Sequence, residues 1–161
     1  MTNNTSPRLR GPGAMALLAL FLIVVLGMGI FIGTQSAPGA WYANLNKPFF
    51  NPPNWIFGPV WTVLYVFIAV AGWRTFRAAP RSKAMVFWYG QMALNWAWSP
   101  LFFVLHQVWN AFAVIACMFA LILLFIKDRW HPDPASALLF CAYATWVGFA
   151  GLLNLSLALM N

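Results

Sequence analysis

The segment WYANLNKPFFNPPNWIFGPVWTVLY, residues 41–65, decides how the rest of the chain is interpreted. It holds too many Pro, Asn and Trp residues to be an uninterrupted membrane-spanning helix, yet it is too apolar to be an ordinary surface loop. Its prolines favour extended or turn geometry, and Asn54 can cap a helix that begins there. The segment therefore predicts an apolar loop that leads into a helix and covers the mouth of a helical bundle as a lid, with Lys47 as its one charge.

The amino-acid composition indicates that lipid surrounds this bundle. Of the 161 residues, 63% are hydrophobic and only 7% are charged, which is too little charge to cover the surface of a soluble domain. Several apolar stretches reach the roughly 20 residues that a helix needs to cross a bilayer. We predict an all-α membrane protein with one domain over residues 1–161. Its five transmembrane helices are expected at about residues 14–34, 54–76, 83–105, 108–126 and 134–160.

The basic residues predict the orientation of the spans, because Lys and Arg are enriched on the cytoplasmic side. In a five-span chain one side would carry Arg8, Arg10, Arg74, Arg77, Arg81, Lys83, Lys127 and Arg129, and the other only Lys47. The N-terminus is therefore expected in the cytoplasm and the C-terminus outside. The net charge of +7 is then mostly a collar that faces anionic lipid. The scattered basic residues do not form the stripe of a nucleic-acid-binding surface.

The polar content of the spans favours binding over catalysis. Both acids, Asp128 and Asp133, fall in one loop, which argues against a proton relay or a cation channel. Cys117 and Cys141 are expected to be packing residues, and the two histidines to lie at the membrane interface. No catalytic residue and no metal ligand is predicted. Amides, hydroxyls and indoles suit a large, mostly apolar ligand with a few polar edges.

Three predicted spans carry such residues at helical spacing, which puts each set on one face. The sets are Trp61 and Tyr65 on the second span, Gln91, Asn95, Trp98 and Ser99 on the third, and Tyr143, Trp146, Ala150 and Asn154 on the fifth. An amide that faces lipid costs free energy, so these faces should point inward and could line a cavity. The alternative for Asn95 and Asn154 is that they only bond neighbouring helices, at about 1 kcal/mol or less each.

Several tryptophans have a different expected role. Trp73, Trp88, Trp109 and Trp130 lie near the ends of the predicted spans. Indoles at such positions typically anchor a helix at the lipid headgroups.

The opening segment also resembles the signature of the TspO/MBR family, the tryptophan-rich sensory proteins related to the translocator protein or peripheral benzodiazepine receptor. The matching residues are Trp41-Tyr42, Leu45, Lys47-Pro48, Pro52-Pro53, Trp55, Phe57, Pro59-Val60-Trp61-Thr62 and Leu64-Tyr65. Two further blocks match, through Gln91, Leu94-Asn95, Trp98-Ser99 and Phe102-Phe103, and through Tyr143, Trp146, Ala150, Leu153-Asn154 and Asn161.

The resemblance implies a five-helix bundle, usually a homodimer, that binds porphyrins such as protoporphyrin IX and haem. Some members also bind sterols and synthetic isoquinoline or benzodiazepine-type ligands. By motif position, the pocket would be lined by Trp61, Asn95, Trp146, Ala150 and Asn154, with the lid from Trp41 through Lys47 to Trp55 above it.

The predicted function is that of a tetrapyrrole-binding protein of a bacterial cytoplasmic membrane, acting in porphyrin transport, sequestration or stress- and light-linked regulation. The macrocycle would stack on Trp61 and Trp146, bond to Asn95 and Asn154 at its polar edge, and meet Lys47 at a propionate. No cofactor is required. The alternatives are light-dependent oxidative degradation of the bound porphyrin, and an assembly scaffold without a ligand.

Overall fold

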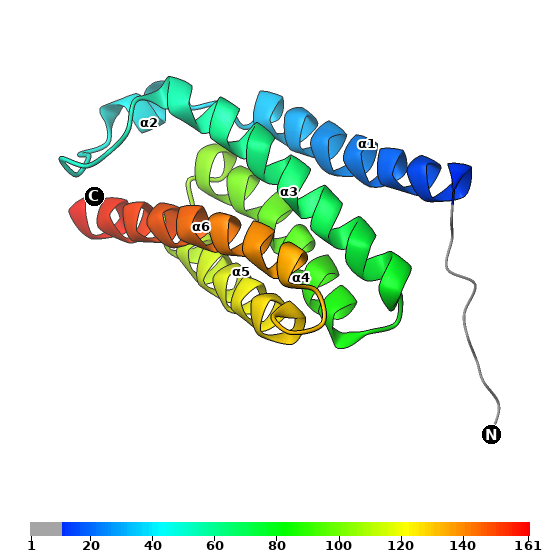
Figure 1. The fold of residues 1–161 in the computed structure, drawn as a ribbon. Coiled ribbons are helices and arrows are strands. Elements are labelled where there is room, and N and C mark those ends of the chain that lie inside the picture. The colour runs from blue at the N-terminus through cyan, green and yellow to red at the C-terminus, as the bar shows by residue number, and fades with distance from the viewer. Residues whose placement is uncertain (1–10) are drawn as a thin grey trace.

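The computed structural model describes residues 11–161, so Arg8 and Arg10 of the orientation prediction lie outside the described residues. Figure 1 shows an all-helical arrangement of these residues, which confirms the all-α part of the predicted fold class. The elements in chain order are α1 (Pro12–Gln35), α2 (Ala40–Asn44), the 3₁₀-helix η1 (Asn54–Ile56), α3 (Phe57–Ala78), α4 (Lys83–Ser99), the π-helix η2 (Pro100–Val104), α5 (Val108–Arg129) and α6 (Pro134–Met160).

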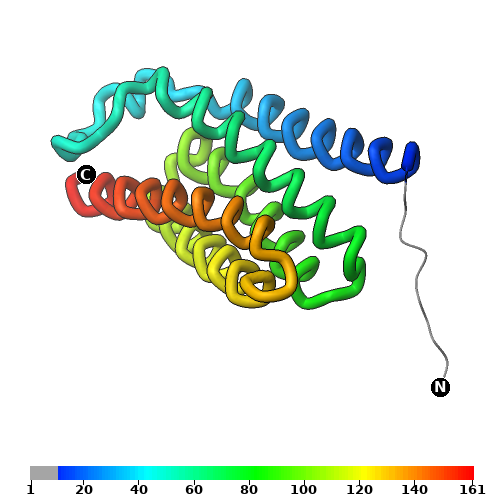
Figure 2. Tube along the Cα trace, in the orientation of Figure 1, coloured from blue at the N-terminus to red at the C-terminus, as the bar shows by residue number. Residues whose placement is uncertain are grey.

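The long helices lie side by side as a bundle (Figures 1 and 2). Helix α5 packs between α4 and α6, α6 also packs on α3, and α1 packs mainly on α3. The short helix α2 and the loop that follows it lie at the end of the bundle that holds the C-terminus (Figure 2). Two hydrogen bonds join this loop to the C-terminus. The Asn46 N–H donates to Asn161 Oδ1 at 2.9 Å, and Asn161 Nδ2 donates to the Asn46 carbonyl at 3.1 Å.

Within residues 11–161, four helical segments are long and apolar enough to cross a membrane, namely α1, η1 with α3, α5 and α6. The remaining predicted span ends as an α-helix at Ser99 and continues through η2 to Val104. Pro100 lacks a backbone N–H, and the Leu105 N–H reaches back five residues to the Pro100 carbonyl at 3.0 Å. A proline that removes a helical hydrogen bond favours such a local change of helix type. A fifth span therefore stays a prediction.

The ends of the helices differ from the predicted bounds by at most three residues when η1 and η2 are counted with α3 and α4. The prediction that Asn54 caps a helix is wrong. Pro53 precedes η1, Ile56 precedes α3, and neither helix has a side-chain cap. Elsewhere Ser82 accepts from the Met85 N–H at the start of α4, and Asp133 accepts from the Ser136 N–H at the start of α6.

The buried centre of the bundle joins α3, α4, α5 and α6. Trp88 belongs to this core and is not a headgroup anchor: it is 5% exposed and its Nε1 donates to the Ile68 carbonyl at 2.9 Å. Trp109 and Trp130 are about half exposed, and their role as headgroup anchors stays a prediction. Cys117 is exposed on α5 instead of buried.

Candidate functional site

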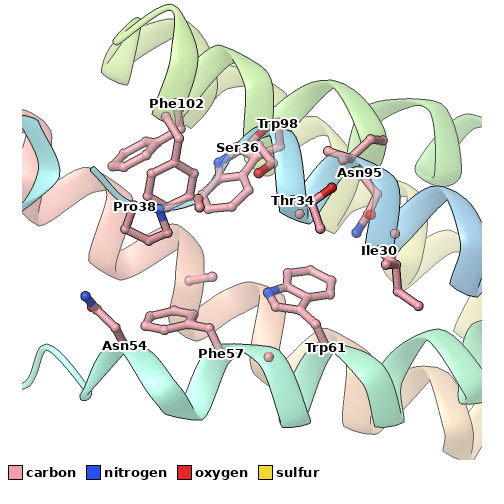
Figure 3. A pocket seen from close by; sticks show the side chains of 18 of the residues that line it. Ile30, Thr34, Ser36, Pro38, Asn54, Phe57, Trp61, Asn95, Trp98 and Phe102 are labelled. Carbon is pink, nitrogen blue, oxygen red and sulfur yellow. The ribbon is translucent and has the colours of Figure 1, made fainter. Parts of the chain in front are cut away.

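A cavity of about 660 Å³ lies between α1, α3, the α4–η2 segment and α6. Figure 3 shows Phe57 and Trp61 on one side of it, facing Asn95, Trp98 and Phe102 on the other. Its volume lies within the range of about 300–1,000 Å³ that is typical of small-molecule sites. Among the described residues, no Lys, Arg, His, Asp or Glu lines it. The cavity therefore suits a large, predominantly apolar ligand.

One wall of the cavity is built by α3, where Phe57, Trp61 and Tyr65 recur every four residues and therefore share a face. The ring of Trp61 lies 5.4 Å from that of Tyr65, centre to centre, and the two planes are tilted by 32°. Trp61 is half-buried, so part of its indole faces the open space. The α3 wall thus presents a continuous aromatic surface.

A buried chain of hydrogen bonds fixes the inner end of the cavity. The Tyr65 hydroxyl donates to Asn95 Oδ1 at 3.0 Å, and Asn95 Nδ2 donates to the Tyr143 hydroxyl at 2.9 Å. The Tyr143 hydroxyl in turn donates to Gln91 Oε1 at 3.0 Å. Because these residues come from α3, α4 and α6, the chain ties three helices together.

A second set of hydrogen bonds fixes the position of Trp98, which lies on the side of the cavity opposite the α3 wall (Figure 3). Trp98 Nε1 donates to Asn154 Oδ1 at 3.0 Å, and Asn154 Nδ2 donates to the Val108 carbonyl at 2.9 Å. The Trp98 ring also stacks on Phe102, with the ring centres 5.5 Å apart. Asn95 and Asn154 therefore bond neighbouring helices, as the alternative interpretation expected. The oxygen and the nitrogen of each amide thus already make a hydrogen bond within the protein.

Seven of the residues that were expected to face a cavity line it together: Trp61, Tyr65, Asn95, Trp98, Ser99, Ala150 and Asn154. Tyr143 is completely buried in the wall, and its ring centre lies 6.2 Å from that of Trp61. Trp146 is not part of the lining. Its ring packs on Phe57, 5.8 Å away, and on Phe149, 5.5 Å away. Because Trp146 is not among the lining residues, Trp61 and Trp146 do not form the expected pair of stacking surfaces.

The three predicted loop residues, Trp41, Lys47 and Trp55, do not line the cavity either. Trp41 stacks on His106 with ring centres 4.1 Å apart, and Trp55 is 73% exposed. Lys47 Nζ donates to the carbonyls of Ala43 at 2.8 Å and Leu45 at 3.2 Å. Its charge is therefore held at the carboxyl end of α2, where unpaired helix carbonyls attract a cation, and over the ring of Tyr42, 4.9 Å from the ring centre.

Tyr42, on α2, is one of the site residues that sequence reasoning missed. It lines the cavity, and its hydroxyl donates to Asn51 Oδ1 at 3.0 Å. Burial raises the pKa of the Tyr42 hydroxyl above 10.0, and the hydrogen bond with Asn51 offsets part of this rise. The hydroxyl therefore stays protonated and holds the loop in place.

The sequence analysis also did not predict that α1 lines the cavity, because that helix is apolar on every side and offers no polar periodicity. It lines the cavity through Gly29, Ile30, Gly33 and Thr34, and Ser36 follows at its end. Phe57 could have been found from the sequence, since it lies four residues before Trp61 on the same helix face.

Comparison with known proteins agrees with this architecture. The sequence pattern of the TspO/MBR family matches residues 18–160. The chain is 38% identical to the tryptophan-rich protein TspO of Archaeoglobus fulgidus, over 89% of this chain and 96% of that protein. It is 34% identical to the protein CrtK of Rhodobacter capsulatus, over 92% and 94% of the two chains. The human translocator protein is 32% identical, over 79% and 80%.

Proposed function

The chain belongs to the TspO/MBR family of membrane proteins, and on that basis we propose that it binds a flat tetrapyrrole, such as protoporphyrin IX or haem, in its cavity. The observation that carries this proposal is the cavity itself. It has about 660 Å³ of space, an aromatic wall on α3 and no charged lining residue among those described. A macrocycle with a wide apolar face matches these properties.

In this proposal the macrocycle lies against the indole of Trp61. Aromatic rings in offset contact contribute about 0.5–1.5 kcal/mol beyond the burial of their area. Trp98 lies on the opposite wall and is held by Asn154 and Phe102. The buried amides act indirectly, because they hold Tyr65 and Trp98 at fixed positions before the ligand arrives. Such preorganisation lowers the entropic cost of binding.

The placement in the membrane is part of the same proposal. The α4–η2 segment would be the fifth span, with the N-terminus and the Arg74–Asp133 end of the bundle in the cytoplasm. The loop after α2 would then lie outside the membrane, beside the C-terminus, and serve as a lid. The chain would act as a homodimer in a bacterial cytoplasmic membrane. It would serve in transport, sequestration or regulation of the bound porphyrin.

A second candidate function is light-dependent oxidation of the bound porphyrin. Trp61 is in ring contact with both Tyr65 and Tyr143. An oxidised or excited macrocycle beside Trp61 could exchange an electron along these rings, with molecular oxygen as the oxidant. This role would use the same cavity.

A titration in the dark tests the proposal. Purified protein in nanodiscs is mixed with protoporphyrin IX, and saturable quenching of tryptophan fluorescence is expected. Trp61→Ala should weaken binding about 2- to 12-fold, which corresponds to the aromatic contact. Trp109→Ala, which removes a half-exposed indole on α5, should leave the affinity unchanged.

The outcomes separate the candidate functions. Equal affinity in the wild type and Trp61→Ala would contradict the site, and absence of saturable binding would contradict the function. Illumination of the complex distinguishes the second candidate, because a new pigment that disappears in Trp61→Phe would indicate oxidation. Sterol and an isoquinoline ligand, titrated in parallel, test the rival occupants.

A further inference from the structure

Ser36 is a buried polar residue at the outer end of the cavity wall. It follows the last residue of α1, and its backbone N–H donates to the Ile32 carbonyl at 2.9 Å. The side chain is 4% exposed and lines the cavity. Figure 3 shows it near the end of α1, on the side of the cavity where Trp98 and Phe102 lie.

The Ser36 hydroxyl has no hydrogen-bond partner. Among the described lining residues, it is the one whose buried side-chain polar atom is unpaired. The other buried lining side chains with polar atoms, Tyr42, Asn95 and Asn154, are bonded within the protein. A buried hydroxyl without a partner costs free energy, so a ligand that supplies an acceptor there is favoured.

The charge of the cavity restricts the kind of acceptor. No cationic side chain is among the described lining residues. Lys47 Nζ lies over the ring of Tyr42, 4.9 Å from the ring centre, and donates to the carbonyls of Ala43 and Leu45. A carboxylate enclosed beside Ser36 would lose its hydration without a lining cation to pair with, which is unfavourable, so the propionates of protoporphyrin IX or haem would have to stay hydrated outside this part of the cavity. A neutral carbonyl oxygen can accept from Ser36 Oγ without that penalty.

We propose that Ser36 is the hydrogen-bond donor that orients the bound macrocycle, and that its partner is a neutral carbonyl oxygen, as in an ester, amide or ketone substituent, in preference to a carboxylate. This inference rests on the proposed function and makes it more specific. It places the carbonyl-bearing edge of the ligand at the outer end of the cavity. The opposite edge then lies toward Tyr65 and Asn95.

Three porphyrin probes separate the parts of this inference. Protoporphyrin IX dimethyl ester carries neutral carbonyls, protoporphyrin IX carries carboxylates at neutral pH, and etioporphyrin carries only alkyl groups. Each is titrated into the wild type, Ser36→Ala and Ser156→Ala in nanodiscs. Ser156 is a matched control, because its hydroxyl donates to the Leu152 carbonyl and it does not line the cavity. Comparison of variants with the same probe cancels the partition of that probe into lipid.

Ser36→Ala should weaken the dimethyl ester about 2- to 10-fold, while leaving etioporphyrin unchanged. Unchanged etioporphyrin binding also shows that the variant is folded. After correction for lipid partition, the ester should bind the wild type more tightly than the diacid.

Two results would overturn the inference while the proposed function stands. One is ester binding that does not respond to Ser36→Ala. The other is diacid that binds as tightly as the ester. If none of the three probes binds saturably, the proposed function itself fails, and the inference fails with it.

Discussion

The ring of Tyr65 on α3 lies directly against the backbone of Gly29 on α1. A Cβ atom added to Gly29 would lie only 2.3 Å from Tyr65 Cε2. This contact places the Tyr65 hydroxyl within 3.0 Å of Asn95 Oδ1. The apolar helix α1 thus determines the position of a polar group that ties α3 to α4.

Gly29→Ala should therefore displace Tyr65 and break its hydrogen bond with Asn95. Overpacking of this kind typically costs about 1–3 kcal/mol, so the free energy of unfolding and the affinity for protoporphyrin IX should both fall. Gly27→Ala is the control on the same helix, since nothing lies within 4 Å of a Cβ at that position. Thermal unfolding in detergent measures the effect, and equal midpoints for the two variants would contradict the account.

Tyr143→Phe tests the buried hydrogen-bond chain without changing the shape of the wall. It leaves the Asn95 amide and Gln91 Oε1 without their partner, because both bond to the Tyr143 hydroxyl. We expect a loss of about 1–3 kcal/mol in unfolding free energy. Tyr89→Phe, at an exposed position on α4, should change stability by no more than about 0.5 kcal/mol.

Asn161→Ala should release the loop that follows α2. Its side chain accepts from the Asn46 N–H and donates to the Asn46 carbonyl. We expect faster hydrogen exchange and proteolysis within residues 45–53, whereas the exchange of α5 stays unchanged. Asn110→Ala is the control, since Asn110 Nδ2 donates only locally, to Gln107 Oε1. A loop protected equally in both variants would show that the pairing with Asn161 does not hold it.

The Arg74–Asp133 ion pair should make stability depend on pH. Arg74 Nη2 lies 2.7 Å from Asp133 Oδ1, and Arg74 Nε lies 3.2 Å from Oδ2. Burial raises the pKa of Asp133, but the hydrogen bonds from Arg74 and Ser136 and the charge of Arg74 outweigh it, so the pKa lies below 3.8. Since the folded-state pKa is lowered, the contribution is present above about pH 4 and lost as the pH falls through the folded-state value.

Asp133→Asn should therefore be less stable than the wild type at neutral pH, and the difference should shrink below about pH 4. Asn remains a good helix cap, so the loss reflects the ion pair together with the hydrogen bond from the Ser136 hydroxyl to Asp133 Oδ2. It should be about 0.2–1 kcal/mol for this partly exposed site. Asp128→Asn is the control, because Asp128 pairs with its chain neighbour Arg129 and joins no helices. A stability difference that is independent of pH would contradict the assignment.

The sequence predicts the helices well and the cavity in part. Apolar length and periodicity determine where spans begin and end, whereas the change to a π-helix at Pro100 depends on hydrogen bonding that a proline alone does not specify. Polar periodicity predicts that Asn95 and Asn154 face inward. It does not predict that their amides are used by Tyr65, Trp98 and the backbone of Val108.

The remaining errors have a common physical cause. A helical period gives the direction of a side chain but not the neighbours that it meets, and Trp146 packs on Phe57 and Phe149 instead of lining the cavity. The sequence pattern also does not predict local side-chain contacts, so the hydrogen bonds from Lys47 to the carbonyls of Ala43 and Leu45 could not be anticipated. Ser36 carries no pattern at all, because it is a single hydroxyl at the end of an apolar helix.

The central claim is that the cavity between α1, α3, α4 and α6 is the tetrapyrrole site. A structure of the protein in lipid nanodiscs with protoporphyrin IX bound tests it most directly. We predict the macrocycle in contact with Trp61, with Asn95 still bonded to Tyr65 and Tyr143. A macrocycle bound on the lipid-facing surface, with the cavity filled by lipid or closed, would contradict the claim.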